Sequence, residues 1–511
     1  MNKGMKLLVV GAVWTLLLSV VVMIFKFFIF PSQENAAKEA AQEQHEQTIE
    51  KTSSDSRYTN QINFALDSFS AYAVFRSEFF KNELAKSKIK LNVVDQPDYT
   101  ERLKSLQSGE TQLAAFTIDA LIKASAQLED MPATIVAFID ETKGADAIVT
   151  YKSSLPNIDS LNNENVKFVL IPDSPSETMA RVVISHFGLS KLSADPFVRV
   201  SNADELFNKY RTAKANDPLA FVTWEPYVSK MIDNPNCQVL VNSSRFRGYI
   251  VDVIVCNRDF LIKNENLVSD FVESYLRSYY NFSSKDEMVK LIVDDSRKLQ
   301  AAISVDQAKR LADTIWWKNT SENFGHMGLS NEQPLQHVED MIQNITNVLI
   351  TTGAIQKDPT DGKYNLFYYD KILSDLKNKN FHPGLSDESI REDDEKLPTL
   401  TDEEWKTLVT VGTLQVPPLV FPRGTAILTD ASEGILNELV EKLKSWPYYY
   451  VGITTNIMSA NPNEADEELK VNRGKVVLDY LSSKIDSSRM KVLVGDKYES
   501  SVTISFLYKP Y

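Results

Sequence analysis

The stretch VLIPDSPSETMARVVISHFGLS, residues 169–190, predicts a buried strand that turns into a helix. The strand covers residues 166–171 and the helix runs from Pro175 to Phe187, with small and polar residues between them. The same order of apolar strand, polar turn and amphipathic helix recurs from about residue 61 to residue 280. Short apolar runs that alternate with such helices are typical of sheets covered on both faces. The sequence therefore predicts an α/β fold for this part of the chain.

Polar, small or aromatic residues follow many of these strands. Ligands of open α/β sheets bind at the carboxyl ends of the strands, where the helix that follows also presents free backbone N–H groups. The candidate ligand-binding residues are Asp67, Ser68, Phe69, Thr117, Asp119, Asp140, Gly144, Asp146, Ser174, Ser176, Thr223, Trp224 and Glu225, with Arg245 as the one nearby cation. Any single Asp, Ser or Thr among them is more simply an ordinary helix cap or turn residue. The set as a whole favours a ligand cleft.

Six segments carry a specific resemblance to a known family. They are ALDSFSAYAVF (65–75), LAAFTIDAL (113–121), AFIDETKGADAIV (137–149), residues 169–190, AFVTWEPYVS (220–229) and VCNRDFL (255–261). In content, order and spacing they resemble the solute-binding proteins of nitrate, sulfonate and thiamine-precursor ABC importers, over roughly residues 60–290. The resemblance implies a type II periplasmic-binding fold, in which two α/β lobes joined by two crossover strands close on a ligand.

The acids at the strand ends bear on the kind of ligand. If two or more of Asp67, Asp119, Asp140, Asp146 and Glu225 point into the cleft, the site favours a cation, an amine or a polyhydroxy compound over nitrate or sulfonate. Arg245 could counterbalance part of the negative charge. By the family resemblance the indole of Trp224 can stack on a ligand while Glu225 offers a charge. The alternative is that most of these acids are solvated or cap helices.

The N-terminus predicts the compartment. Residues 7–30 form an apolar stretch long enough to cross a bilayer, preceded by Lys3 and Lys6 and followed by several glutamates. An uncleaved anchor is favoured over a cleaved signal peptide because the stretch is long and ends in Phe-Phe-Ile-Phe-Pro. We therefore expect a membrane anchor at residues 1–31 and a polar spacer at 32–58. The bulk of the chain would lie outside a bacterial inner membrane, in the periplasm or cell envelope.

Composition argues against several classes of protein. The formal net charge is −14 and no basic stripe with interleaved aromatic residues is present, which argues against nucleic-acid binding. Five histidines and two cysteines form no HExxH or CxxC spacing, so we expect no metal site and no cofactor. Cys237 opens one predicted strand and Cys256 closes the next. They can form a disulfide if those strands pair antiparallel, and two free buried thiols are the alternative.

The rest of the chain divides into two parts. Residues 59–380 form the two-lobed domain with a helical C-terminal extension, in which helices are predicted at 304–317 and 336–352. Residues 381–404 are rich in acids, Ser and Pro and are predicted to be a linker. From residue 405 to 511 the predicted order is strand, helix, strand, helix, strand, strand. The last strand, residues 502–508, alternates as a half-buried edge strand would.

This C-terminal part resembles the OmpA-like domains that bind peptidoglycan in bacterial cell walls, and the resemblance implies an α+β sandwich. The matching positions are Phe421, Gly424, Leu428, Leu469, Arg473, Tyr480 and Leu481. By this resemblance Arg473 would grip a carboxylate of the peptide stem, a task that suits the guanidinium fork. Thr455 stands where the family has an Asp that holds an ammonium group. The resemblance therefore implies peptidoglycan binding with half of the charged clamp missing.

Together these parts predict a solute-binding protein of ABC-importer type, anchored in the membrane and tethered to the wall. Its partners would be a small polar or cationic solute, peptidoglycan, and an ABC permease or another envelope protein. The alternative is an envelope scaffold or sensor that keeps the binding-protein fold and assembles with other envelope proteins. No GxSxG motif, Walker loop or nucleophile–base pair is present, so we expect no enzyme and no catalytic residue.

Overall fold

The computed structural model describes residues 58–509, apart from 129–130, 226, 331–334, 385–387, 392–396 and 459–462. The predicted anchor at 1–31 and all but the last residue of the spacer at 32–58 lie outside these residues. Among the helices that the structure describes, none combines the length and the apolar character that a membrane span requires.

The first lobe is built on a six-stranded mixed sheet with the strand order β11-β4-β10-β3-β1-β2. Its strands are β1 (Asn60–Leu66), β2 (Ile89–Asp95), β3 (Leu113–Thr117), β4 (Ala133–Thr142), β10 (Val251–Asn257) and β11 (Ile315–Trp317). β1 pairs in parallel with β3, whereas β10 runs antiparallel to both β3 and β4. Every residue of β4 and β10 is buried, which explains why both read as nearly unbroken apolar runs.

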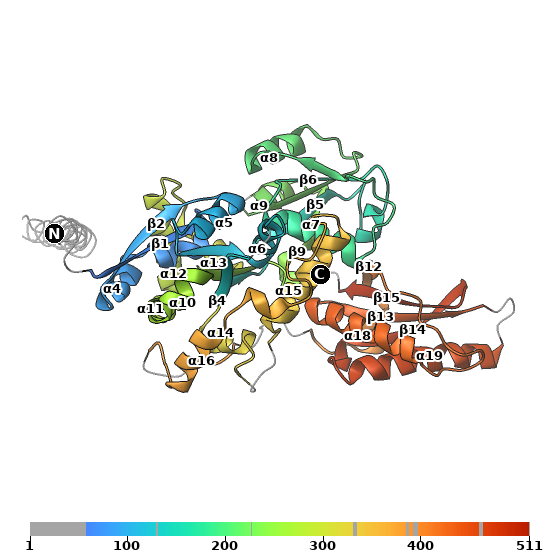
Figure 1. Ribbon diagram of the computed structural model, residues 1–511. Helices are drawn as coiled ribbons and strands as arrows, with labels where there is room; N and C mark the ends of the chain where they lie inside the picture. Colours follow the sequence, from blue (N-terminus) through green and yellow to red (C-terminus); the bar gives the residue numbers. More distant parts are fainter. Residues whose placement is uncertain are drawn as a thin grey trace, which may run out of the picture. The chain divides into compact units, whose positions relative to one another are not determined.

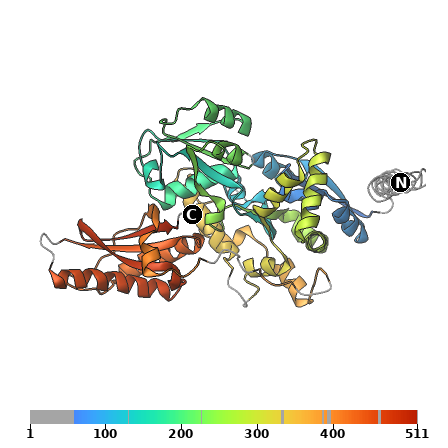
Figure 2. The same cartoon turned by 180° about the vertical axis from the view of Figure 1, so that it is seen from behind.

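Helices cover this sheet and return to it after the second lobe has been completed (Figure 1). They are η3 (Ser70–Tyr72), α3 (Ala73–Arg76), α4 (Glu78–Lys86), α5 (Tyr99–Ser108), α6 (Ile118–Ser125), α10 (Arg258–Lys263), α11 (Glu265–Asn281), α12 (Lys285–Lys298), α13 (Val305–Asp313), α14 (Thr320–His326), α15 (Val338–Thr351), η6 (Tyr364–Phe367) and α16 (Lys371–Asn378). Helices α11 and α12 pack against the early helices α3 and α4. Figure 2 shows this group, blue and yellow-green, from the opposite side.

The second lobe has a five-stranded sheet with the order β7-β6-β8-β5-β9. Its elements are β5 (Asp146–Tyr151), η4 (Ile158–Leu161), β6 (Lys167–Leu170), α7 (Pro175–His186), β7 (Phe197–Arg199), α8 (Ala203–Thr212), β8 (Leu219–Trp224), α9 (Tyr227–Ile232) and β9 (Cys237–Asn242). Helices α7, α8 and α9 pack on this sheet. The Ser174 side chain accepts a hydrogen bond from Glu177 N, and Pro175 occupies the first turn of α7, so the strand and helix predicted from residues 169–190 are confirmed.

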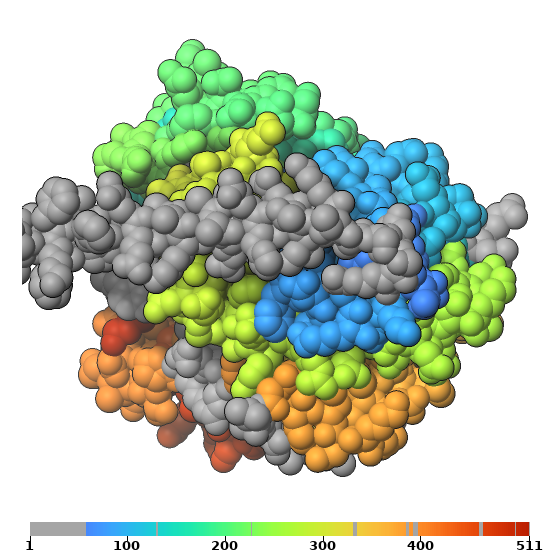
Figure 3. Space-filling model, turned by 90° about the vertical axis from the view of Figure 1, so that its left-hand side faces the viewer, coloured from blue at the N-terminus to red at the C-terminus, as the bar shows by residue number. Residues whose placement is uncertain are grey.

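The chain passes between the two sheets twice. β4 leads into β5 through residues 143–145, the first crossover, and β9 leads back to β10 through residues 243–250, the second crossover, which includes η5 (Ser243–Arg245). Ser243 Oγ accepts hydrogen bonds from Gly144 N at 2.9 Å and Asp146 N at 3.3 Å, so the two crossovers are tied together. Two α/β sheets joined by two crossovers form the two-lobed arrangement predicted from the sequence. Figure 3 shows the green second lobe above the blue and yellow-green parts of the first.

The helical extension differs from the prediction in one place. The helix expected at 304–317 is wrong in its last part, because α13 ends at Asp313 and β11 pairs antiparallel with β4 at the edge of the sheet. Thr314, Ile315 and two tryptophans favour a strand, and the edge of β4 satisfies their backbone groups. The helix expected at 336–352 is present as α15.

The segment predicted to be a linker, residues 381–404, contacts both of the parts that it joins. Arg391 forms an ion pair with Glu322 of α14 at 2.6 Å, and its guanidinium Nε donates to the same carboxylate at 3.0 Å. Further along, Tyr450 of the C-terminal domain donates a hydrogen bond to the carbonyl oxygen of Pro398 at 2.7 Å. The segment is therefore fastened at several described points.

The C-terminal domain is a four-stranded sheet with two long helices. Its elements are α17 (Asp402–Lys406), β12 (Val409–Leu414), α18 (Asp430–Ser445), β13 (Tyr450–Ile457), α19 (Glu464–Ser482), η7 (Ser487–Arg489), β14 (Met490–Tyr498) and β15 (Ser501–Tyr508). The predicted order of strands and helices is confirmed. The last strand is not at an edge, because the sheet order is β12-β15-β13-β14 and β15 pairs antiparallel on both sides.

Candidate functional site

A cavity of about 360 Å³ lies between the two lobes, at the ends of strands from both sheets. It is lined by Asp67, Ser68, Phe69, Ser70, Tyr72, Tyr99, Thr117, Thr142, Ala145, Asp146, Pro175, Trp224, Glu225, Asp252, Leu311 and Ile315. We call it the cleft. The first lobe supplies most of this lining, whereas Asp146, Pro175, Trp224 and Glu225 come from the second lobe. Its position matches the strand-end site expected for an α/β protein.

The charge of the cleft is strongly one-sided. Four carboxyl groups line it, and no Lys, Arg or His is found among the described residues of the lining. One carboxyl group, that of Asp67, is paired with Arg102 at 2.8 Å. Arg102 is completely buried and also donates to the carbonyl oxygens of Gln96 and Ala115. Arg102 therefore neutralises Asp67 and bonds the backbone of the first lobe, but it does not line the cleft. The other three carboxyl groups have no cationic partner among the lining residues.

Two buried acids are neighbours in the sheet of the first lobe, and one of them, Asp252, lines the cleft. Asp252 of β10 is the cross-strand partner of Asp140 of β4, and the hydroxyl of Tyr72 donates a hydrogen bond to Asp252. The oxygens of Asp140 receive no hydrogen bond from any N–H or hydroxyl group that the structure describes. Burial, followed by the charge of Asp252, raises the pKa of Asp140 far above its ordinary value, and burial also raises the pKa of Asp252. The pair therefore retains a proton over a wide pH range.

The second lobe contributes two further acids. Asp146 at the start of β5 accepts a hydrogen bond from Ser176 Oγ at 2.7 Å. Burial raises the pKa of Asp146 to about 6, with a smaller contribution from the charge of Asp119. Glu225 follows β8 and accepts hydrogen bonds from the backbone N–H and the hydroxyl of Ser229, at 3.1 and 2.9 Å. These contacts orient both carboxyl groups without neutralising either of them.

Aromatic rings and hydroxyl groups complete the lining. Phe69 and Tyr72 meet edge to face at 5.4 Å between ring centroids, and Tyr99 and Trp224 also line the cleft. Trp224 is the cross-strand partner of Asp146, which places an indole beside a carboxyl group. The hydroxyl group of Thr142 makes no hydrogen bond to any described group, so it is available to a ligand. Carboxyl groups next to aromatic faces form the chemistry that binds ammonium-type cations.

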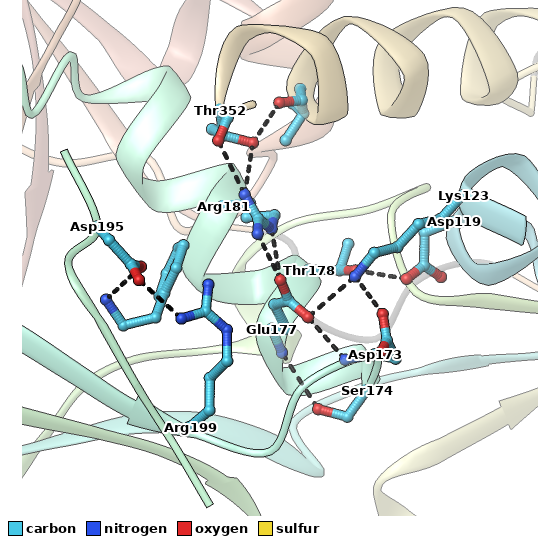
Figure 4. Close-up of polar contacts among 12 residues, drawn as sticks. Asp119, Lys123, Asp173, Ser174, Glu177, Thr178, Arg181, Asp195, Arg199 and Thr352 are labelled. Carbon is cyan, nitrogen blue, oxygen red and sulfur yellow. Dashed lines mark hydrogen bonds and ion pairs between the residues drawn. The ribbon is translucent and has the colours of Figure 1, made fainter. Parts of the chain in front are cut away.

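A second cavity of about 360 Å³ lies between α6 of the first lobe and α7 of the second. Figure 4 shows the polar contacts around it. Lys123 forms ion pairs with Asp173 and, at 3.1 Å, with Glu177, while the Thr178 hydroxyl donates to Asp119. Burial alone would raise the pKa of Glu177, but the charges of Lys123 and Arg181 lower it.

The charged groups of this second cavity therefore pair with one another across the boundary between the lobes. Arg181 adds a hydrogen bond of 2.9 Å to the Thr352 carbonyl oxygen after α15, and it holds Glu177 from the other side. Because its charges are already matched, we interpret this region as a latch between the lobes. The cleft, in which three of the four acids have no cationic partner among the lining residues, is the candidate binding site.

The structure brings about half of the predicted site residues together. Asp67, Ser68, Phe69, Thr117, Asp146, Trp224 and Glu225 line the cleft, whereas Asp119 and Ser174 line the latch cavity. Four others support the cleft or lie nearby: Ser176 holds Asp146, Asp140 lies behind Asp252, Gly144 forms the first crossover, and Thr223 is completely buried in β8.

Sequence reasoning missed Tyr72, Tyr99, Arg102, Thr142 and Asp252. The signal for Asp252 was present, because it is a lone acid inside the apolar stretch YIVDVIVC, residues 249–256. A fully buried strand tolerates such an acid only where it has a polar partner or a ligand. The other four carry no comparable signal in the sequence. Tyr72, Tyr99 and Arg102 lie in helices and Thr142 ends β4, and their places at the cleft depend on how these elements pack.

One prediction from the sequence is wrong, and one pair of alternatives is decided in favour of two free buried thiols. Arg245 does not balance the cleft, because its guanidinium lies over the ring of Tyr449 in the C-terminal domain, 5.8 Å from the centroid. Cys237 and Cys256 form no disulfide: β9 belongs to the sheet of the second lobe and β10 to that of the first, so the two strands never pair. Both thiols are free and buried, and Cys237 contacts the hydroxyl of Tyr210 at 3.6 Å.

The proposed wall-binding residues of the C-terminal domain face inward. Arg473 is 7% exposed, donates to the Thr425 carbonyl oxygen at 2.9 Å and lies over the ring of Phe421 at 4.9 Å. Thr455 is completely buried, and its hydroxyl donates to the Lys470 carbonyl oxygen at 2.8 Å. Both residues therefore contribute to the packing of the domain.

In the part of the chain that the structure describes, no group of His, Cys, Asp and Glu side chains is placed to hold a metal ion.

Comparison with known proteins gave matches among solved structures alone. No family model matches the sequence, and no curated protein does either. The periplasmic aliphatic sulphonate-binding protein SsuA of Escherichia coli is 14% identical, with 66% of this chain and 98% of that chain covered at a TM-score of 0.45. The periplasmic nitrate-binding protein NrtA of Synechocystis is 12% identical over 63% and 89% of the two chains, also at 0.45. A zinc-bound ligand-binding component of an ABC-type import system from Staphylococcus aureus is 14% identical over 62% and 98%, at 0.44.

Proposed function

We propose that this protein is an extracytoplasmic binding protein that captures a small organic cation in the cleft between its two lobes. The observation that supports the proposal is the lining of the cleft, which contains four carboxyl groups, four aromatic rings and no basic residue among its described members. Arg102 neutralises Asp67 alone. A cationic ligand would supply the positive charge that Asp146, Glu225 and Asp252 lack.

The same lining disfavours an anion. A nitrate or sulfonate group placed there would be repelled by the carboxylates and would find no guanidinium or ammonium group to pair with. A ligand with a positive group and a compact apolar body fits better, because the positive group can meet Asp252 or Glu225 while the body packs on Trp224. The volume, about 360 Å³, is near the lower end of the range for small-molecule sites, about 300–1,000 Å³.

The proposal includes a place in the cell. The apolar stretch at residues 7–30 supports an anchor in the inner membrane, with the two lobes in the periplasm or cell envelope. In this setting the protein would present its solute to an ABC permease, as the resemblance of residues 60–290 suggests. The resemblance of residues 405–511 to OmpA-like domains supports a second attachment, to peptidoglycan.

A second candidate function, an envelope scaffold or sensor, is favoured by the C-terminal domain. Arg473 and Thr455 are buried and hydrogen-bonded within the domain, so neither is free to hold a peptide stem in this conformation. The two candidates are separated by sedimenting the full chain with purified peptidoglycan. Co-sedimentation supports the wall-tethered receptor, and its absence favours assembly with another envelope protein.

Thermal unfolding of the full chain tests the binding proposal. The ligands are matched pairs that differ in charge but little in shape, choline against 3,3-dimethylbutanol and benzylamine against benzyl alcohol, with nitrate and methanesulfonate as anions. A ligand that binds only the folded state raises the free energy of unfolding, by about 2.7 kcal/mol at a hundred times its Kd, and therefore raises the midpoint temperature. We expect stabilisation by cationic members alone.

Two variants sharpen this test. Asp252→Asn should reduce the stabilisation by a cation, whereas Glu164→Gln, which changes an exposed acid outside the cleft, should retain all of it. Stabilisation by an anion, or equal stabilisation by both members of each pair, would refute the proposal.

A further inference from the structure

The C-terminal domain packs on the second lobe through a buried tryptophan. Trp446 follows α18, is completely buried, and donates a hydrogen bond from Nε1 to Nδ1 of His186 at 2.7 Å. Its ring also contacts Phe187 at the end of α7 and Phe246 in the second crossover, at 5.5 and 5.2 Å between centroids. One side chain of the C-terminal domain therefore touches both the second lobe and the segment that joins the lobes.

The second crossover is held by the C-terminal domain at its backbone as well. Arg247 N donates to the Ser445 carbonyl oxygen at 2.7 Å, and its guanidinium donates to the hydroxyl of Tyr448 at 2.5 Å. Tyr249, two residues later, shares a hydrogen bond of 3.0 Å with Nε2 of His186. Backbone, guanidinium and phenol of one short segment are thus fixed by the same interface.

The same crossover contacts the strands β4 and β11, which contribute Thr142 and Ile315 to the lining of the cleft. On its other side the Arg247 guanidinium stacks over Trp316, 4.8 Å from the ring centroid, and the neighbouring Ile315 lines the cleft. Gly248 N donates to Glu141 of β4 at 2.7 Å. Asp252 is the second residue of β10, the strand that follows the crossover. A change in the backbone of residues 243–250 would therefore alter contacts both beside the cleft and with the C-terminal domain.

We infer that closing of the two lobes and docking of the C-terminal domain are coupled, so that the C-terminal domain reports whether the cleft is occupied. Two-lobed proteins open and close through the few residues that join the lobes, which absorb the change in backbone dihedrals. In this structure the lobes are held together by the latch, Lys123 with Glu177 and Thr178 with Asp119, while the C-terminal domain is docked. The docked domain therefore fixes the second crossover in the conformation in which the latch is formed.

The coupling works in both directions. A solute that favours the closed lobes strengthens docking, and loss of docking weakens closure by the same factor. This gives the protein a second output besides delivery of a solute, namely a C-terminal domain that is held when the cleft is filled and released when it is empty. The inference goes beyond the proposed function and does not depend on the identity of the solute.

The test measures two distances in the full chain by pulsed electron paramagnetic resonance. Spin labels on exposed positions of α5 and α8 report the separation of the lobes, and labels on α8 and α19 report docking of the C-terminal domain. Lys123→Met breaks the latch at a point that does not touch the C-terminal domain. Its control is Arg199→Met, which removes an ion pair of 2.8 Å that lies entirely within the second lobe.

The reciprocal variant is His186→Leu, which removes the hydrogen bonds to Trp446 and Tyr249. Its control is Tyr480→Phe, which removes a hydrogen bond of 2.9 Å to Asn437 inside the C-terminal domain. We expect Lys123→Met to lengthen and broaden both distances, His186→Leu to do the same, and the two controls to leave both unchanged.

Three results would overturn the inference. The first is that the lobes separate in Lys123→Met while the C-terminal domain stays docked. The second is that His186→Leu releases the C-terminal domain while the separation of the lobes is unchanged. The third is that neither variant alters either distance, because the contacts that carry the argument would then hold neither part in place.

Discussion

Replacement of Asp146 by Asn should stabilise the ligand-free protein at neutral pH. Asp146 is buried at the start of β5, where Ser176 Oγ is its hydrogen-bond donor. Asn has nearly the same shape, and its carbonyl oxygen can accept the same hydrogen bond from Ser176. The substitution therefore removes a negative charge from the cleft while it keeps the geometry.

The magnitude follows from the pKa of this carboxyl group. Burial raises the pKa of Asp146 from 3.8 to about 6, a shift of about 2 units, and each unit corresponds to about 1.4 kcal/mol. Between these two values the folded state binds the proton more tightly than the unfolded state, so stability falls as pH rises from about 4 to about 6. Above that window the ionised group makes the folded state about 3 kcal/mol less stable than it would be with a neutral side chain. Asp146→Asn should recover most of this difference.

The assay is urea unfolding of the full chain and the Asp146→Asn variant at several pH values, without ligand. We expect the variant to be more stable at pH 7 by up to about 3 kcal/mol, and the difference to shrink towards pH 4. Other carboxyl groups titrate in the same range, but they contribute equally to both proteins. A variant that is less stable at pH 7, or a difference that does not change with pH, would refute the reasoning.

Four further results are expected. Lys318→Met should destabilise the protein by about 3–5 kcal/mol in urea unfolding, because it leaves the buried carboxylate of Glu141 without its partner at 2.7 Å. Asp252→Asn should lower the affinity for a stabilising cation by about ten- to a hundredfold in titration calorimetry, since it removes a charged partner from the cleft. Burial lowers the pKa of His186 to about 3, so stability should fall as pH drops from about 6.5 towards 3, and His186→Leu should lack this component in acid unfolding. Arg473→Ala should destabilise the C-terminal domain by about 1–3 kcal/mol in thermal unfolding, whether or not the chain binds peptidoglycan.

The architecture of the two lobes was predictable because each βα unit carries its own local signals. In residues 169–190 an apolar run, a serine cap and Pro175 at the first helical turn each indicate the same strand and helix. The prediction failed where tertiary pairing decided the outcome. Residues 315–317 are predicted to end a helix but become β11, because β4 offers an edge that only the folded sheet contains.

The cleft was predictable in position but not in composition. Strand ends locate a site by topology, and Asp67, Asp146 and Trp224 were found in this way. The partners of those residues come from other elements, and no spacing in the sequence shows that Arg102 neutralises Asp67 from inside the first lobe. The direction of Arg245 could not be foreseen either, because the C-terminal domain that receives it begins far along the chain.

The buried acids at the cleft explain why binding of a cation should be favourable. Asp140 and Asp252 adjoin in a buried sheet, and each raises the free energy of the other's ionised form. A protein that needed only stability would have apolar residues at these positions. A cation beside Asp252 favours its ionised form, so binding should release protons from the pair and strengthen as pH rises. Protons released on binding can be counted by calorimetry in buffers of different ionisation enthalpy, and a cation that binds without proton release at pH 6 would show that it does not lie beside Asp252.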